Sequence, residues 1–245
     1  MRQFRLPRRR QTPVVTGEVV CYRRRQMTNP RSFEGRPEGA FSFRQQLKRA
    51  TADLHRRLES ELRLVDPDLS LDRYRRILEC FFGFYAPVEA GIARASSAGP
   101  ALGLPLRERA ALVESDLLSL GLSRRDVAAL PRCADLPRLS GTEAIAGCLY
   151  VLEGACLGGQ LIAPALYERF GIARGSGASF FVGDGDRTKA RWSVFLAWLE
   201  SLERAGARID EIVASARATF LSFAEWAERL DDSRRASEGA TPWST

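Results

Sequence analysis

The chain has 245 residues, of which 45% are hydrophobic, and a formal net charge of +7. This length and composition allow one or two domains with a sizeable core. Residues 1–37 hold ten arginines against two glutamates, so they carry a net charge of +8 and the rest of the chain carries −1. The basic character belongs to an N-terminal leader, and a function in binding nucleic acid or a membrane surface would depend on that leader alone.

Cysteine and histidine usage narrows the function further. The five cysteines form no CxxC pair and there is one histidine, which excludes a disulfide framework, a zinc site and every multi-histidine metal site. No uninterrupted apolar run approaches the length of a membrane span, and the twin arginines Arg8-Arg9 lack the apolar segment of an export signal. We therefore expect a cytoplasmic protein with no membrane span and no nucleic-acid partner.

The N-terminal part of the chain is predicted to be a leader followed by two helices. Residues 1–40 mix arginine, proline and glycine with few large apolar residues, which predicts disorder. Apolar residues spaced three and four apart predict an amphipathic helix over residues 43–62. Asp66-Pro67-Asp68 ends this helix, and Ser70 is placed to cap a second helix, whose apolar residues run from 71 to 88.

Helices also dominate the remaining sequence. The apolar pattern predicts five of them, over residues 106–120, 123–130, 141–169, 187–205 and 207–230. Capping boxes are expected at the start of two of them: Ser123 with Asp126, and Ser140 with Glu143. Residues 171–185 are predicted to be a loop rich in glycine and serine, and residues 231–245 a polar tail. Because the chain shows no βαβ alternation and no repeat, we predict a single compact all-α domain over residues 41–230.

The predicted helix over residues 141–169 contains four glycines: Gly147, Gly154, Gly158 and Gly159. Each costs about 1 kcal/mol of helix propensity relative to alanine, so their presence needs a reason. Gly147, Gly154 and Gly158 share one face of the helix. A face without Cβ atoms allows the helix to bend, and it allows either a neighbouring helix or a flat ligand to approach closely.

His55 lies near the end of the first predicted helix, and Lys48 precedes it by two turns. A lone helical histidine is most often solvated or hydrogen-bonded. Imidazole is also a good axial ligand for haem iron, and a lysine on the same helix could then pair with a haem propionate. His55 and the glycine-rich helix together therefore indicate a site in which a planar macrocycle lies between two helices.

Three segments of the chain match a known family: Leu47-Lys-Arg-Ala-Thr-Ala-Asp-Leu-His55, Leu149-Tyr-Val-Leu-Glu-Gly-Ala-Cys-Leu-Gly-Gly-Gln160 and Phe180-Phe-Val-Gly-Asp-Gly185. Through them the chain from about residue 43 to residue 228 resembles the haem oxygenases, and most closely the bacterial branch often found with phytochromes. The first segment resembles the family's proximal helix, and the second resembles its distal helix.

The resemblance implies a fold and an activity. The expected fold is a compact helical domain that clamps haem between the first helix and a kinked, glycine-rich distal helix. The expected reaction is the oxidation of haem to biliverdin, carbon monoxide and ferrous iron. It requires O2 and an external electron donor, either a reductase or a ferredoxin-type protein, and the branch implies a bacteriophytochrome as a further partner.

The resemblance also implies roles for individual residues. His55 is the expected axial ligand of the iron and thus the metal-binding residue. Lys48 matches a propionate-binding lysine, and Arg191 is a second candidate for the same role. The residues expected against the distal face of the haem are Gly154, Gly158 and Gly159.

One position departs from the family pattern. Many haem oxygenases carry an aspartate three residues before the paired glycines, where it organises distal water, and this chain has Ala155 there. Glu153 points about 160° away from Ala155 around the helix and does not simply replace the aspartate. This leaves open a second function, that of a non-catalytic haem-binding or carrier protein on the same scaffold.

Overall fold

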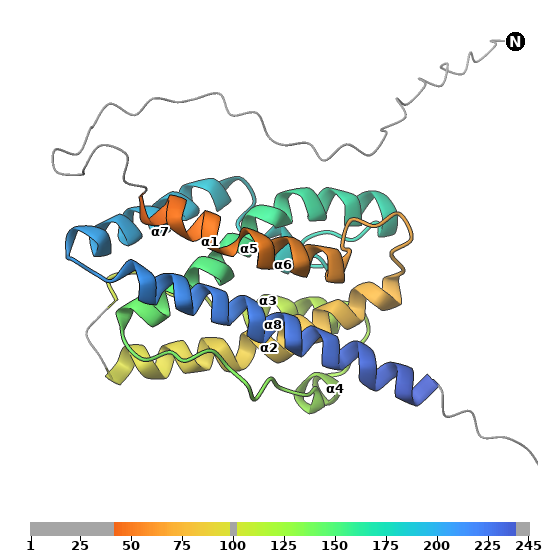
Figure 1. Cartoon of the computed structure of the whole chain (residues 1–245). Coiled ribbons are helices and arrows are strands. Elements are labelled where there is room, and N and C mark those ends of the chain that lie inside the picture. The colour runs from red at the N-terminus through yellow and green to blue at the C-terminus, as the bar shows by residue number, and fades with distance from the viewer. Residues whose placement is uncertain (1–41, 99–101, 239–245) are drawn as a thin grey trace, which may run out of the picture. The chain divides into compact units, whose positions relative to one another are not determined.

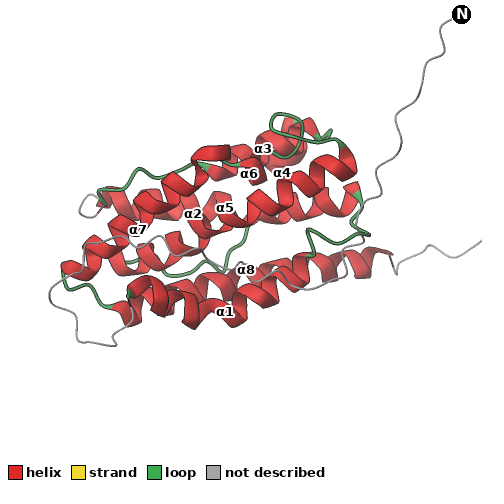
Figure 2. Ribbon diagram, turned by 90° about the horizontal axis from the view of Figure 1, so that it is seen from above, coloured by secondary structure: helices red, strands yellow, loops and turns green. Residues whose placement is uncertain are grey.

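The structure is a computed structural model that describes residues 42–98 and 102–238, so the predicted leader over residues 1–40 lies outside the described residues. Figure 1 and Figure 2 show that the regular elements of the described part are all helical, which confirms the predicted all-α class. In chain order the elements are α1 (Phe43–Leu62), α2 (Leu71–Ala98), α3 (Arg109–Ser119), α4 (Arg124–Ala129), α5 (Thr142–Phe170), α6 (Ser179–Val182), a 3-10 turn (Gly185–Arg187), α7 (Thr188–Arg204) and α8 (Ile209–Glu238).

The second helix extends beyond the apolar residues that indicate it. α2 continues past Val88 to Ala98, although Pro87 lies inside it. Val88 and Ile92 are buried one turn apart on the same face of the helix. This tertiary packing offsets the backbone hydrogen bond that a proline cannot make.

Two segments that were predicted to lack regular structure are partly helical. α8 continues to Glu238, so the predicted polar tail over residues 231–245 begins as helix. The predicted loop over residues 171–185 contains α6, whose Phe180 and Phe181 are buried. A helix of four residues is too short to show the apolar periodicity that reveals longer helices.

The two predicted capping boxes have different outcomes. Ser123 and Asp126 form the expected box at the start of α4. The box expected from Ser140 and Glu143 is wrong, because the N-cap of α5 is Gly141 and no side chain caps the helix. Gly141 has a φ of 89°, which a residue with a Cβ atom rarely adopts, and this turn leaves the preceding serine outside the cap position.

α5 is the central helix of the described residues. It packs along α8 and also contacts α6 and α7, and ten of its residues are buried. Beside it, the ring of Phe81 from α2 makes edge contacts with Phe180 at 5.1 Å and with Phe223 at 5.0 Å. The aromatic core therefore joins α2, α6 and α8 around the glycine-rich helix.

By length and composition alone, α5 is a described helix that could cross a membrane. Its most apolar stretch is 50% buried within the fold. It contains no uninterrupted apolar run of membrane-spanning length, because Glu153 interrupts the apolar sequence. The central helix of a folded core has the same composition, and the packing of α5 accounts for its apolar character.

Candidate functional site

The predicted site residues lie on α1 and α5, which are connected by a side-chain contact, and, in the case of Arg191, on α7. Both helices pack against α7 and α8, but they make no extensive contact with each other. Tyr150 of α5 connects them, because its hydroxyl lies close enough to Thr51 of α1 for the Thr51 side chain to affect its pKa. Figure 1 shows that α1 and α5 run in the same direction, from left to right. One turn beyond this contact, α1 carries His55 and α5 carries Gly154, so the structure brings these two predicted residues to neighbouring helices.

The face of α1 that contains His55 is polar and basic. Arg44, Lys48, Thr51 and His55 follow one another at spacings of four, three and four residues, so they share one face of the helix. Lys48 is exposed, and 55% of the His55 side chain is exposed. Leu47, about 70° around the helix from the centre of this face, is fully buried, and Thr51 itself is only 3% exposed. α1 therefore packs through Leu47 and Thr51 and exposes the cationic side chains of this face together with the chain's only histidine.

The His55 imidazole is oriented by its own helix and by α8. Its Nδ1 atom lies 3.3 Å from Oε2 of Glu59, one turn further along α1. The ring also makes an edge contact with Phe220, with the ring centroids 5.9 Å apart. A carboxylate that accepts the Nδ1 proton leaves the lone pair on Nε2, which is the arrangement of a histidine that binds a metal.

Two of the four α5 glycines are needed for packing. A Cβ atom at Gly147 would lie 2.2 Å from the carbonyl oxygen of Ile212 in α8. A Cβ atom at Gly159 would lie 2.1 Å from the carbonyl oxygen of Phe181 in α6. Since both neighbours are backbone atoms that cannot rotate away, these glycines allow α5 to approach α8 and α6 closely.

The other two glycines face open space. A Cβ atom at Gly158 would meet no atom within 4 Å, and one at Gly154 would only touch the Trp192 ring at 4.0 Å. Leu161, further along the same side of α5, is 76% exposed. A stripe of open glycines beside an exposed leucine forms a smooth apolar surface that a flat ligand can cover.

A cluster of aromatic side chains packs beside Gly154. The ring centroid of Trp192 in α7 lies 5.9 Å from that of Tyr150 and 5.2 Å from that of Phe195. Burial raises the pKa of the Tyr150 hydroxyl, while the nearby Thr51 side chain and the charge of Arg44 act in the opposite direction. The hydroxyl therefore remains protonated at neutral pH at the boundary between α1 and α5.

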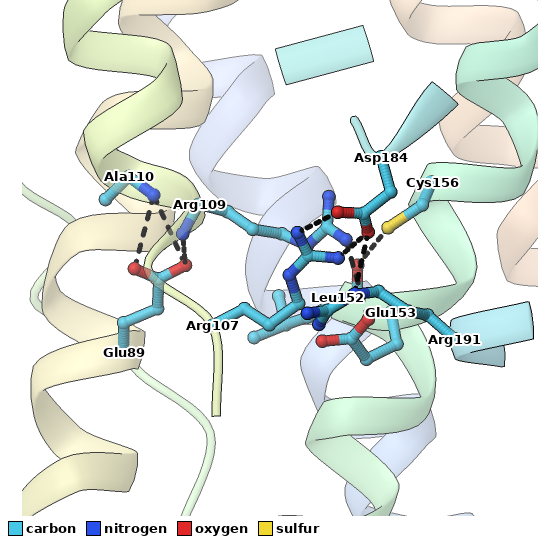
Figure 3. Close-up of polar contacts among 9 residues, drawn as sticks. All are labelled: Glu89, Arg107, Arg109, Ala110, Leu152, Glu153, Cys156, Asp184 and Arg191. Carbon is cyan, nitrogen blue, oxygen red and sulfur yellow. Dashed lines mark hydrogen bonds and ion pairs between the residues drawn. The ribbon is translucent and has the colours of Figure 1, made fainter. Parts of the chain in front are cut away.

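The two cations predicted for propionate binding have different surroundings. Lys48 is exposed on the face of α1 that carries His55. Arg191, at the start of α7, has its Nε atom 3.4 Å from Oδ2 of Asp184. Asp184 also accepts hydrogen bonds from both terminal nitrogens of Arg107, as Figure 3 shows. Arg191 is therefore engaged with an internal carboxylate, whereas Lys48 is directed to solvent.

Three residues of this site were not predicted from the sequence: Arg44, Thr51 and Tyr150. The available signal was their spacing, since Thr51 precedes His55 by four residues and Tyr150 precedes Gly154 by four. The contact that unites them links two helices far apart in the chain. No periodicity within one helix reveals such a contact.

Glu153 lies on the flank of α5 next to the glycine face. Its Oε2 atom is 3.5 Å from a terminal nitrogen of Arg109 in α3, and the Glu153 and Arg109 side chains are 15% and 3% exposed. This ion pair directs Glu153 toward α3. It does not bring the carboxylate to the position where Ala155 lacks one.

The comparisons with known proteins agree with this geometry. The family model described as Heme oxygenase matches residues 41–229, which is most of the chain. A similar solved structure is the heme oxygenase from Neisseria meningitidis with NO and CO bound, with a TM-score of 0.62 and 21% sequence identity over 78% of this chain and 92% of that chain. No curated protein matches the chain. The structural likeness shows a shared fold, and the family match shows that the chain belongs to the haem oxygenase family.

Proposed function

We propose that this chain is a catalytically active haem oxygenase, which oxidises haem to biliverdin, carbon monoxide and ferrous iron. The reaction uses O2 and electrons from an external reductase or a ferredoxin-type donor. The observation that carries the proposal is the pairing of the only histidine, on α1, with the open glycines Gly154 and Gly158 on the connected helix α5. The shared fold and family membership support it.

The residues of α1 fit one face and one edge of a haem. Nε2 of His55 is the ligand atom, because Nδ1 is directed at Glu59. Lys48, exposed on the same face, pairs with a propionate, and Arg44 one turn earlier adds a second positive charge. Arg191 contributes to propionate binding only if it leaves Asp184.

The residues of α5 fit the other face of the haem. Gly154 and Gly158 allow the helix backbone to lie close to the macrocycle, because neither carries a Cβ atom. Gly159 acts indirectly, since its contact with Phe181 fixes the course of α5. When bound, haem supplies the iron that activates O2 and the ring that is oxidised. The chain positions that ring and covers its apolar surface.

A non-catalytic haem carrier is the second candidate function. The observation that favours it is Ala155, which places a methyl group where many family members have a carboxylate. A carrier needs the axial ligand and the propionate contacts but no proton supply. The two functions therefore differ in what happens after reduction, and not in how haem is bound.

The test follows the visible spectrum of the full chain, first with added hemin and then with a reductant under air. An active enzyme shows a Soret band that decays as biliverdin absorbance rises and CO is released. A Soret band that persists through repeated additions of reductant contradicts the catalytic proposal. The non-catalytic haem carrier is then the remaining candidate function.

The ligand assignment is tested with His55→Ala and a matched control, Arg56→Ala, an exposed neighbour on α1. His55→Ala is expected to lose the axial-ligand spectrum, whereas Arg56→Ala retains it. An unchanged axial-ligand spectrum in His55→Ala would show that the iron is bound elsewhere.

The compartment and the partners are part of the proposal. The described cysteines Cys148 and Cys156 are free and buried, and Cys80 and Cys133 are buried as well, which suits a reducing cytoplasm. A bacteriophytochrome is the partner implied by the branch that the chain resembles. That partnership is tested directly by adding purified apo-phytochrome to the reaction. Transfer of newly formed biliverdin to it is measured as the appearance of the red absorbance of the assembled phytochrome.

A further inference from the structure

A small polar cavity lies beside α5 on the side that faces α2 and α3. Its volume is about 30 Å³, and its polar lining comes from Glu89 of α2, from Arg107 and Arg109, and from Glu153 of α5. Apolar side chains form the remaining walls. A space of this size holds one water molecule when polar groups are present to bind it.

Arg109 contributes a donor that lacks a partner. Its side chain is only 3% exposed, and one terminal nitrogen lies 3.5 Å from Glu153. Its Nε atom is buried and has no hydrogen-bond partner among the described residues. A guanidinium group keeps its charge and all its protons, so a buried Nε–H requires an acceptor. The cavity that Arg109 lines is where that acceptor fits.

Glu89 contributes a carboxyl group that titrates near neutral pH. Figure 3 shows it at the N-terminus of α3, where its carboxyl oxygens accept hydrogen bonds from two backbone N–H groups. The nitrogen–oxygen distances are 2.9 Å for Arg109 and 3.2 Å for Ala110. Burial raises the pKa of Glu89 to about 7, although these hydrogen bonds and the Arg109 charge oppose the shift. The other titratable and charged groups around it are Tyr85, Arg107, Glu108 and Glu153.

We propose that this cavity binds one water molecule, which accepts the Arg109 Nε–H and connects Glu89 to Glu153. The water donates its two hydrogens to the two carboxyl groups when both are ionised. When Glu89 is protonated, its proton moves to the water as a water proton moves to Glu153, so the water remains neutral throughout. Glu89 then regains a proton from solvent.

This arrangement places an exchangeable proton on the glycine-rich helix. Glu153 is adjacent in sequence to Gly154, which lies on the open face of α5. The chain lacks a carboxylate at Ala155, and the water site provides a proton donor on the flank of the same helix. This consequence rests on the proposed function. Glu89 and Arg109 act through Glu153 and are positioning residues.

The first experiment uses the full chain without haem. Isotope-edited infrared titration of chain with labelled glutamate is expected to show one carboxyl group with a midpoint near pH 7, absent in Glu89→Gln. A nuclear Overhauser effect between the Arg109 Hε proton and a slowly exchanging water is expected in the same sample. A wild-type chain that lacks either signal overturns the proposal, whatever the outcome of the haem assays.

Matched variants identify the groups involved. Glu108→Gln removes an exposed carboxylate beside the same helix start and is expected to keep both signals. Glu89→Gln retains a side-chain oxygen that can accept the N–H groups of α3, so its fold is expected to persist. If Glu89→Gln does not fold, the two wild-type signals and Glu108→Gln decide the matter. A titration near pH 7 that is lost in Glu108→Gln overturns the assignment to Glu89.

The second experiment measures the pH profile of haem oxidation. The rate of haem oxidation is expected to change with an apparent pKa near 7 in the wild type and in Glu108→Gln. This transition is expected to be absent in Glu89→Gln and in Glu153→Gln. Loss of a positioned proton donor is expected to lower the rate by about 100-fold in Glu153→Gln. Unchanged rates and profiles in both cavity variants overturn the role in catalysis. An inactive wild type refutes the proposed function and leaves the water site to the haem-free measurements.

Discussion

Gly147 and Gly159 differ from Gly154 and Gly158 in what an added Cβ atom would meet, although all four belong to α5. At the first two positions the atom would lie 2.2 Å and 2.1 Å from backbone carbonyl oxygens of α8 and α6. At the other two it would reach ordinary contact distance or nothing at all. One helix thus carries glycines that its own fold requires and glycines that the fold leaves open.

This difference separates structural from functional glycines by physical criteria alone. A glycine in a helix is unfavourable by about 1 kcal/mol relative to alanine. Where close packing requires the glycine, that packing offsets the loss. Where the surroundings are empty, the fold gains nothing from the glycine, and we propose that a bound ligand is the reason for it. Three glycine substitutions test this distinction, and the pH dependence of stability tests the neighbouring flank of the same helix.

The largest effect is expected for Gly147→Ala. Its Cβ atom would meet the Ile212 carbonyl oxygen at 2.2 Å and the Ala216 amide nitrogen at 2.7 Å, so α5 and α8 must separate. We expect a loss of about 3 kcal/mol or more in the free energy of unfolding, measured by urea denaturation. A variant as stable as the wild type would show that the two helices can separate without cost, and the proposed distinction would fail.

A somewhat smaller loss is expected for Gly159→Ala. The clash is with the Phe181 carbonyl oxygen in α6, a helix of four residues that can shift more easily than α8. Its displacement disturbs two short hydrogen bonds, in which the Ser179 and Phe180 N–H groups donate to Asp116 at 2.7 Å. We expect a loss of about 2 kcal/mol in the same denaturation experiment. Equal stability of Gly159→Ala and Gly158→Ala would remove the distinction between them.

The pH dependence of stability tests whether Glu89 titrates on the side of α5 that faces α2. Burial raises the pKa of Glu89 from its ordinary value of 4.5 to about 7, so the folded state favours the neutral acid. The stabilisation of the fold by the protonated Glu89 carboxyl is fully present below about pH 4.5 and is lost as the pH rises through 7. Relative to Glu89→Gln, the wild type is expected to lose about 2 kcal/mol of unfolding free energy between pH 4.5 and pH 8.

The control for this prediction is Glu108→Gln, whose stability curve should parallel that of the wild type. Parallel curves for the wild type and Glu89→Gln would instead mean that Glu89 is ionised throughout this range. In that case the buried side of α5 would carry a fixed charge and no titrating group.

The smallest stability effect, with the opposite sign, is expected for Gly158→Ala. Because nothing lies within 4 Å of the new Cβ atom, the gain in helix propensity should stabilise the fold by about 0.5–1 kcal/mol. The same methyl group would separate the helix from a bound haem. We expect the initial rate of haem oxidation to fall by about tenfold. A variant that is more stable and fully active would show that the open face is not the haem-binding surface.

Sequence patterns predicted the long amphipathic helices and missed what depends on distant contacts. The spacing of apolar residues predicted α1 over the residues where it is found, because an amphipathic helix repeats its apolar face within its own sequence. α6 was missed, since its four residues are held by Asp116 of α3 and by burial of Phe181. The capping box predicted at Ser140 failed because a glycine with positive φ intervenes.

The candidate site shows the same division. His55 and the glycines of α5 were identified from their residue types and from the family resemblance. Tyr150 and Thr51 were not, because their relevance comes from a contact between helices that are distant in the chain. Arg191 was a candidate through the family resemblance, and only the fold revealed its contact with Asp184.

Composition and periodicity were sufficient to predict the helical class, the single histidine and the glycines that one helix contains. These are local properties, since composition and periodicity depend only on neighbouring residues. The tertiary structure decided which glycines are packed against a neighbour, which cations are engaged, and that Arg109 and Glu153 border one cavity. Such properties depend on distances between residues that are far apart in the chain, and these distances arise only when the helices pack.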